Sequence, residues 1–248
     1  MRRGRPTVWK LWGTDHAINT GDAELLLAFD ALDLAPSLSD KKAKALHALL
    51  AERYLAVIEG QYLDFTLAAA GLTGPKVSRA AYLTMLDHKT AKLFRAATEV
   101  GGVIAGRATR EVKALGDFGE NLGMAYQLYD DWQSIWGNPK ETGKKRAGDL
   151  YERKKTLPII YARDHLPLKD ARRLTKLYNK KRMTRAEVVE VLALLEKTDA
   201  RAELERTAKH YKVRALQALE KTTLDAPTRE LLADLARTLV PDTVAASR

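Results

Sequence analysis

The sequence has no cysteine at any of its 248 positions. Disulfide bonds, thiolate metal sites and a cysteine nucleophile are therefore excluded, and we expect a reducing compartment, with the cytoplasm as the default location. Long apolar runs are also missing, since no stretch reaches the roughly 18 apolar residues that a membrane-spanning helix needs. No apolar segment follows the charges of residues 1–6, as it would in a signal peptide. We expect a protein that is neither secreted nor membrane-spanning.

Strand signals are equally scarce. We find no alternating apolar pattern, no Asn-Gly hairpin signal, and no internal repeat of about 20 to 50 residues. The apolar fraction of 46% is ordinary for a globular protein, and the length of 248 residues is near the upper end of what one core supports. The sequence therefore predicts an all-α protein with a single domain over residues 1–248.

Apolar residues at helical spacing predict three long helices. The first runs from Ser39 to Gly71. The second begins at Ser78 and continues to about Thr98, and the pair Gly101-Gly102 predicts a break or kink after it. The third runs from Asp117 to Trp136 and ends at Gly137.

The second half of the chain carries shorter helical signals. A helix beginning at Asp149 has to accommodate Pro158, and Thr184 with Glu187 forms a capping box that predicts a further helix start. Between the third long helix and Asp149 lies a lysine-rich loop with two glycines, residues 138–148. This loop is strongly basic, and we expect the helices after it to act as support.

The formal net charge of +10 allows three kinds of partner. Nucleic acid, an anionic membrane surface and an acidic small molecule such as a diphosphate would each be attracted by a basic surface. A basic surface that only faces solvent is a fourth interpretation. No helix-turn-helix or zinc signature supports nucleic acid, although the basic cluster over residues 140–155 keeps that alternative open.

Two adjacent carboxylates lie near the end of the third long helix. Spacings of three and four residues place Gln127, Asp130 or Asp131, and Ser134 along one side of the helix. Magnesium takes one or two carboxylates together with water and phosphate oxygens, which this pair can supply. The alternative is an exposed Asp-Asp pair, but carboxylates near a helix carboxy-terminus interact unfavourably with the helix dipole and favour a compensating cation.

Several basic side chains complete a candidate site. Lys89 and Thr90 lie in the middle of an apolar-periodic helix, Lys144 lies in the basic loop, and Lys154 follows it. Each lysine alone is explained by a long side chain reaching solvent. Together with the aspartate pair they make a plausible clamp for a magnesium diphosphate, since phosphate oxygens bind both metal ions and ammonium groups.

In these residues the chain resembles the trans-isoprenyl diphosphate synthases, also called polyprenyl synthetases. The resemblance is collinear through most of the chain, and the shared order is more specific than any one block. The matching blocks are Arg2 to Trp9, Ala17 to Asp22, Gly60 to Asp64, Lys89-Thr90, Phe118 to Gln127, Asp130-Asp131, Gly143-Lys144, and Asp149 with Lys154 to Pro158.

The resemblance implies an isoprenoid synthase-type helical bundle that condenses isopentenyl diphosphate with an allylic diphosphate, using Mg²⁺, in a cytoplasmic homodimer. By resemblance, the allylic diphosphate contacts Arg2, Lys89, Lys144 and Lys154, and the isopentenyl diphosphate contacts Arg3. The allylic carbocation is faced by Thr90 and Gln127. The metal is bound by Asp130 and Asp131.

The chain also departs from the family pattern. The family's first aspartate-rich motif belongs just before Arg2, where only Met1 stands, so the resemblance implies an N-terminally truncated bundle. Ser134 stands where the second motif usually has its third aspartate. We therefore expect weak or absent turnover by this chain alone. A non-catalytic or regulatory subunit and a diverged terpene synthase-like protein are the alternatives, and a basic nucleic-acid-binding protein is a more distant one.

Overall fold

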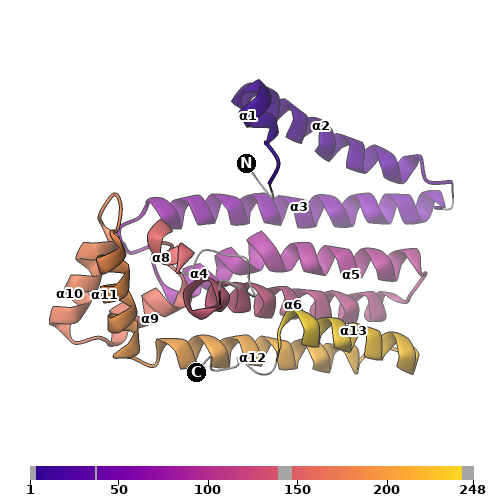
Figure 1. Ribbon diagram of the computed structural model, residues 1–248. Helices are drawn as coiled ribbons and strands as arrows, with labels where there is room; N and C mark the ends of the chain where they lie inside the picture. Colours follow the sequence, from indigo (N-terminus) through magenta and orange to yellow (C-terminus); the bar gives the residue numbers. More distant parts are fainter. Residues whose placement is uncertain (1–3, 37, 139–146, 242–248) are drawn as a thin grey trace. The chain divides into compact units, whose positions relative to one another are not determined.

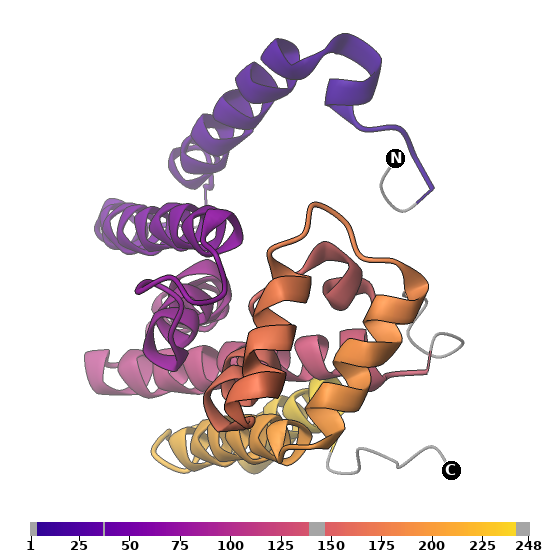
Figure 2. The ribbon, with the colours of Figure 1, turned by 90° about the vertical axis from the view of Figure 1, so that its left-hand side faces the viewer.

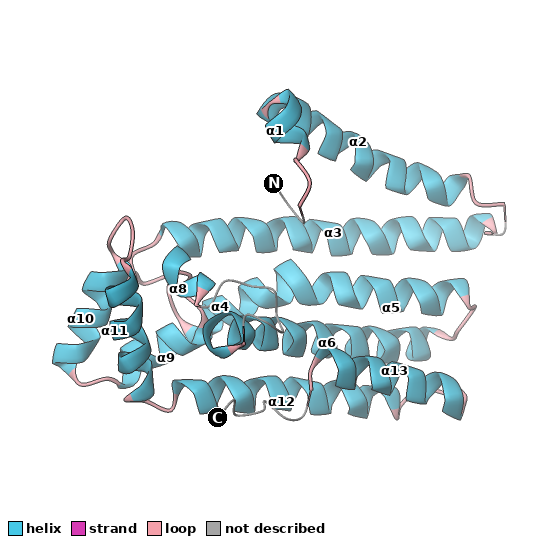
Figure 3. Ribbon diagram, in the orientation of Figure 1, coloured by secondary structure: helices cyan, strands magenta, loops and turns pink. Residues whose placement is uncertain are grey.

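The computed structural model describes residues 4–36, 38–138 and 147–241. All regular structure in these residues is helical, with no strand among them (Figure 3). The prediction of an all-α protein is confirmed. The helices, labelled as in Figure 1, are α1 (Val8–Trp12), α2 (Thr14–Asp33), α3 (Asp40–Ala69), α4 (Arg79–Leu86), the π-helix η1 (Asp87–Ala91), α5 (Lys92–Ile104), α6 (Thr109–Trp136), α8 (Gly148–Glu152), α9 (Leu157–His165), α10 (Leu168–Tyr178), α11 (Arg185–Glu196), α12 (Ala200–Leu219) and α13 (Ala226–Leu239).

The chain divides into two compact units, residues 1–51 and residues 52–248. Unit 1 contains α1, α2 and the first part of α3. Within it, His47 stacks on Phe29 with ring centroids 5.5 Å apart and hydrogen-bonds Asp33 at 2.9 Å. These contacts join α2 to the beginning of α3. The single domain over residues 1–248 stays a prediction.

Unit 2 contains the remaining helices, built around α6. Its larger apolar core joins α4, α6 and the α8 to α12 segment through side chains such as Leu128, Leu150 and Leu174. A second core packs Phe118 of α6 against α12 and α13. Figure 2 views this unit from the end at which α8 to α11 lie. None of the described helices is both long and apolar enough to cross a membrane.

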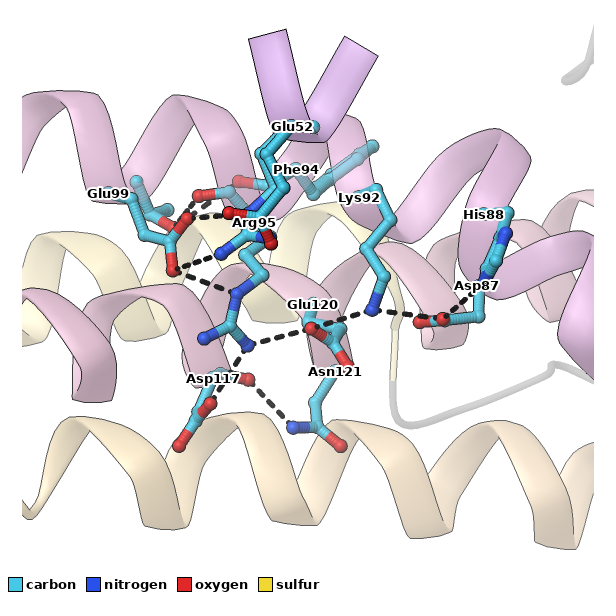
Figure 4. Close-up of polar contacts among 12 residues, drawn as sticks. Glu52, Asp87, His88, Lys92, Phe94, Arg95, Glu99, Asp117, Glu120 and Asn121 are labelled. Carbon is cyan, nitrogen blue, oxygen red and sulfur yellow. Dashed lines mark hydrogen bonds and ion pairs between the residues drawn. The ribbon is translucent and has the colours of Figure 1, made fainter. Parts of the chain in front are cut away.

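A network of polar contacts joins α3, α5 and α6 (Figure 4). Arg95 of α5 donates to Glu99 at 2.8 Å, to Asp117 at 2.9 Å and to Glu120 at 2.7 Å, and Arg53 of α3 also donates to Glu99. Burial alone would raise the pKa of Glu120, but the Arg95 and Lys92 cations hold it below its ordinary value. The charges therefore compensate one another inside the bundle, as buried ions require.

The long-helix predictions are confirmed for α3 and α6. The predicted boundaries 39–71 and 117–136 lie close to the observed helices, although α6 begins eight residues earlier, at Thr109. The capping box at α11 is also confirmed, because the Thr184 side chain accepts from the Glu187 amide and the Glu187 side chain accepts from the Thr184 amide.

Two local predictions are wrong. Gly101 and Gly102 do not break the helix, because α5 continues through both, and Gly102 instead lets α6 approach, with Leu115 and Val112 beside it. The helix is interrupted earlier, by the π-turn η1. The helix expected from Asp149 across Pro158 is two helices, α8 and α9. Pro158 lies in the first turn of α9, where the missing amide costs nothing.

Candidate functional site

A cavity of about 100 Å³ lies within unit 2, between the carboxy-terminal part of α3 and helices α4, η1 and α6. The segment between α8 and α9 closes its remaining side. Apolar side chains of α3 and α4 form part of the wall, and polar groups form the rest. Its lining residues are Asp64, Leu67, Ala68, Tyr82, Met85, Leu86, Lys89, Gln127, Asp131, Lys154, Lys155 and Thr156.

The π-turn η1 presents Lys89 to this cavity. Such insertions add one residue to a helical turn and often mark functional sites. Gly60 of α3 allows the close packing here, since a Cβ atom at that position would lie 2.2 Å from the Lys89 backbone nitrogen. The Lys89 ammonium donates to the Asp64 carboxylate, also on α3. The lysine is thus held at the wall by one carboxylate.

Asp131 lies at the buried end of the site. Its side chain is 4% exposed and accepts hydrogen bonds from the Tyr82 hydroxyl and from Gln127 Nε2, the latter at 3.2 Å. Burial raises the pKa of Asp131 to about 7, helped by the charges of Asp149 and Asp130, although the two hydrogen bonds lower it. A cation brought next to Asp131 would favour its charged form.

Gln127 is oriented by hydrogen bonds at both ends of its amide. The Thr90 hydroxyl donates to Gln127 Oε1 at 3.1 Å, while Gln127 Nε2 donates to Asp131. The four-residue spacing between Gln127 and Asp131 on α6 brings both onto one face, as predicted from the sequence. Thr90, Gln127 and Asp131 therefore form one hydrogen-bonded chain from η1 into α6.

Lys154, from the segment between α8 and α9, also lines the cavity. Its ammonium bonds Asp149 Oδ1 at 2.7 Å, and this pairing keeps the pKa of Lys154 above its ordinary value although burial acts in the opposite direction. Asp149 is itself anchored, because its backbone amide donates to the Ser134 hydroxyl at 3.1 Å. Ser134, which stands where the family's second motif usually has its third aspartate, contributes here to holding α8 against α6.

The structure brings together Lys89, Gln127, Asp131 and Lys154 at the cavity, with Thr90 bonded directly behind Gln127. Asp130 does not line the cavity, although its charge acts on its neighbour Asp131. The predicted phosphate contacts Arg2, Arg3 and Lys144 lie outside the described residues.

Sequence analysis missed the roles of Tyr82, Asp64 and Asp149 in this site. Tyr82 reads as a core residue because it falls on the apolar face of its helix, and nothing in its spacing indicates a carboxylate partner 49 positions away. Asp64 and Asp149 occur within the blocks of the family resemblance. Their pairing with Lys89 and Lys154 depends on contacts between helices that are distant in sequence.

Magnesium fits this site only as a metal shared with a phosphate ligand. In the part of the chain that the structure describes, no three or more His, Asp or Glu side chains are grouped to hold a metal ion. Both oxygens of Asp131 already accept hydrogen bonds. Asp130 and Asp131 would supply the one or two carboxylates that magnesium needs when phosphate and water complete its shell.

Comparison with known proteins identifies the family. The family model described as polyprenyl synthetase matches residues 1–195. The chain belongs to the polyprenyl synthetase family. Its structure is similar to that of a geranylgeranyl pyrophosphate synthetase from Pyrococcus horikoshii, with a TM-score of 0.88 at 30% identity over 98% of this chain and 72% of that one. The fold is thus the all-α fold of the isoprenyl synthases.

Curated proteins with similar sequences are also named as prenyl diphosphate synthases. A (2E,6E)-farnesyl diphosphate synthase of Mycobacterium tuberculosis is 40% identical over 164 residues, which are 66% of this chain and 44% of the relative. A geranylfarnesyl diphosphate synthase of Aeropyrum pernix is 31% identical over 94% of this chain and 71% of the relative. The chain spans less than half the length of the mycobacterial relative it matches.

Proposed function

We propose that this polyprenyl synthetase chain is a trans-prenyltransferase that condenses isopentenyl diphosphate with an allylic diphosphate to give a longer prenyl diphosphate. The observation that carries the proposal is the cavity at which Lys89, Lys154, Gln127 and Asp131 meet. Two cations, an oriented amide and a buried carboxylate next to apolar walls match a substrate that has a charged head and a hydrocarbon tail.

The two lysines would hold the allylic diphosphate. In this structure Lys89 is bonded to Asp64, and Lys154 is bonded to Asp149 with Glu152 3.6 Å away, so each ammonium keeps at least one donor for a phosphate oxygen. As the carbon–oxygen bond of the allylic diphosphate breaks, negative charge grows on the leaving diphosphate. Ammonium groups already in place stabilise that charge without reorganising at the moment of reaction.

The amide of Gln127 would face the allylic cation and stabilise its positive charge through the amide oxygen, while the Thr90 hydroxyl would orient that amide from behind. The double bond of isopentenyl diphosphate attacks this cation, and the proton lost afterwards passes to diphosphate. The apolar wall formed by Leu67, Met85 and Leu86 would exclude water, which would otherwise capture the cation.

Magnesium, which we propose as the metal, would be held by Asp130 and Asp131 and would neutralise diphosphate charge when bound. Asp131 would have to give up the hydrogen bond that it accepts from Tyr82 or from Gln127 before it could reach the cation.

We also propose that the protein acts as a homodimer in the cytoplasm. Four large apolar side chains, Leu55, Ile58, Tyr62 and Phe65, lie exposed along one stripe of α3, with spacings of three and four residues. A stripe of this kind on a helix surface commonly packs against another helix.

The proposal is tested by calorimetry and turnover with geranyl diphosphate, isopentenyl diphosphate and magnesium. We expect magnesium-dependent binding of geranyl diphosphate that Asp130→Ala weakens at least ~10-fold, as expected for a lost charged contact. Asp234→Ala removes an exposed carboxylate of α13 and serves as the control, which should bind like the wild type.

Three outcomes separate the alternatives. Binding with formation of a longer prenyl diphosphate supports the synthase and makes the expectation of weak turnover wrong. Binding without turnover favours the non-catalytic subunit. If geranyl diphosphate binds without magnesium dependence, or binds Asp130→Ala as tightly as the wild type, the proposed site is wrong.

A further inference from the structure

A second cavity, of about 400 Å³, lies next to the proposed prenyl site in unit 2. It is formed by the end of α3, the segment around the end of α8, and the end of α10. Ala68, Lys154 and Lys155 line both cavities, so the two share a wall. The complete lining of the second cavity is Ala68, Ala69, Ala70, Gly71, Glu152, Arg153, Lys154, Lys155, Tyr178, Asn179, Lys180 and Lys181.

The charges of this second cavity are not balanced. Lys180 pairs with Glu187, and Lys154 pairs with Asp149 and with Glu152. No carboxylate among the described residues pairs with Arg153, Lys155 or Lys181. Three cationic side chains therefore line a concave surface to which the described part of the chain brings no pairing carboxylate.

Two of these cations are held in place by backbone carbonyls. Lys155 Nζ donates to the Ala68 carbonyl at 2.6 Å, and Arg153 Nη1 donates to the Lys181 carbonyl at 2.6 Å. Burial, together with the neighbouring Arg153 charge, lowers the pKa of Lys155. Carbonyl contacts leave further donors on both groups, and an anion would relieve the repulsion between them.

A buried hydroxyl points to the same conclusion. Tyr178 of α10 lines this cavity and is 3% exposed, yet its hydroxyl has no hydrogen-bond partner among the described residues. Buried hydroxyls in native proteins nearly always have a partner, and an exception often indicates a bound water or ion. An oxyanion or an ordered water in the cavity would supply the missing acceptor once neighbouring side chains shift, because the hydroxyl oxygen itself has almost no exposed surface.

We propose that the second cavity binds inorganic diphosphate as it leaves the prenyl site. The identity of this anion rests on the proposed function, since diphosphate is the co-product of that reaction. The geometry requires only a compact polyanion that can be bound by Arg153, Lys155 and Lys181. Because Lys154 and Lys155 line both cavities, the anion can pass from one to the other without leaving cationic side chains.

The test is titration of inorganic diphosphate into the full chain by calorimetry, with a chelator present to exclude magnesium. We expect Lys181→Ala to weaken binding roughly tenfold, the effect of losing one charged hydrogen bond. Lys176→Ala removes the same charge from an exposed position on α10 and is the matched control. Equal affinities for the two variants, or no binding by the wild type at millimolar diphosphate, would overturn the proposal.

Tyr178→Phe provides a second variant that preserves volume. We expect it to fold normally and to bind diphosphate several-fold more weakly than the wild type, because the acceptor that satisfies the hydroxyl is the anion or its water. If Tyr178→Phe binds diphosphate as tightly as the wild type, the hydroxyl is unsatisfied in both states, and the anion does not bind at the floor of the cavity.

Asp130→Ala separates this inference from the proposed function. It should leave magnesium-free diphosphate binding unchanged while abolishing magnesium-dependent binding of geranyl diphosphate. If the geranyl diphosphate experiment fails but Lys181→Ala still weakens diphosphate binding, the anion site stands and only its role as a product site is wrong.

Discussion

Adjacent residues with identical side chains have different surroundings in this protein. Asp130 and Asp131 are neighbours on α6, but only Asp131 lines the cavity and bonds to Tyr82. Burial changes the chemistry of Asp131, whose pKa rises to about 7. The second carboxylate of the pair is thus buried and bonded to other protein groups.

Two buried tyrosines should respond in opposite ways to loss of the hydroxyl. Tyr82 donates to Asp131, whereas the Tyr178 hydroxyl has no hydrogen-bond partner within residues 4–36, 38–138 and 147–241. We expect Tyr82→Phe to lower the free energy of unfolding by ~1–3 kcal/mol, because it leaves a buried carboxylate short of a donor. Tyr178→Phe should leave stability unchanged or raise it. Urea denaturation of both variants measures this, and equal losses would contradict it.

At the scale of single elements, the π-turn η1 and the glycine opposite it belong together. A cavity wall built from Lys89 requires α3 to approach the backbone of η1 more closely than a side chain at Gly60 would allow. The extra residue in the π-turn and the missing side chain of Gly60 together allow α3 to pack closely against η1.

Gly60→Ala should therefore destabilise the protein by at least ~2 kcal/mol, because the new methyl group meets backbone atoms that cannot move aside. Gly101→Ala on α5 is the control. Nothing lies within 4 Å of a Cβ atom there, so a helix-favouring alanine should stabilise by up to ~1 kcal/mol. Thermal unfolding of both variants measures the difference, and a tolerated Gly60→Ala would show that η1 can shift.

The capping box of α11 predicts a pH dependence. A hydrogen bond from Lys180, together with the Thr184 amide, lowers the pKa of Glu187 from 4.5 to about 2. A lowered pKa means that the folded state prefers the charged form, so this stabilisation is present above pH 4.5 and is lost as the pH falls through about 2.

Glu187→Gln should accordingly lower the thermal midpoint at pH 7, with a difference from wild type that shrinks between pH 4.5 and 2. Glu196→Gln, at the carboxy-terminal end of the same helix, is the control and should not lower the midpoint at pH 7, since a negative charge there does not favour the helix dipole. Thermal scans by circular dichroism across this pH range are the measurement. A difference that persists unchanged at pH 2 would contradict the charge argument.

At the scale of the whole molecule, the positions of the unpaired charges are more informative than the net charge of +10. Many basic side chains are paired with carboxylates, as in the Arg95 network of Figure 4. Among the described residues, an excess of positive charge remains at the second cavity, where no carboxylate pairs with Arg153, Lys155 or Lys181. A local excess of positive charge suits a member of the polyprenyl synthetase family, since its farnesyl and geranylfarnesyl diphosphate synthase relatives are named for anionic products.

The homodimer prediction is tested by light scattering after size-exclusion chromatography. We expect a mass near twice that of the 27.6 kDa chain, and a monomer for Ile58→Glu, because a charge in the centre of the exposed α3 stripe is costly to bury. Val189→Glu alters an equally exposed apolar residue on α11 and should remain dimeric. A monomeric wild type would make the homodimer prediction wrong.

The sequence by itself determined the helical class, the course of α3 and α6, the α11 cap, and the residue types of the site. These depend on periodicity and on contacts three or four residues apart, such as Gln127 with Asp131, which a single helix dictates. It also carried the family resemblance, through blocks that keep their order along the chain.

Only the tertiary structure decided which of these groups meet. The packing of α3, α4, η1, α6 and the α8–α9 segment determines the partners of Lys89, Asp131 and Lys154. The π-turn in place of a glycine break and the second cavity, with its unbalanced charge, also arise from packing in this region. The physical reason is that burial and charge pairing are properties of surroundings assembled from distant parts of the chain. Helical periodicity shows which face of a helix is covered, but it does not show which side chain of another helix covers it.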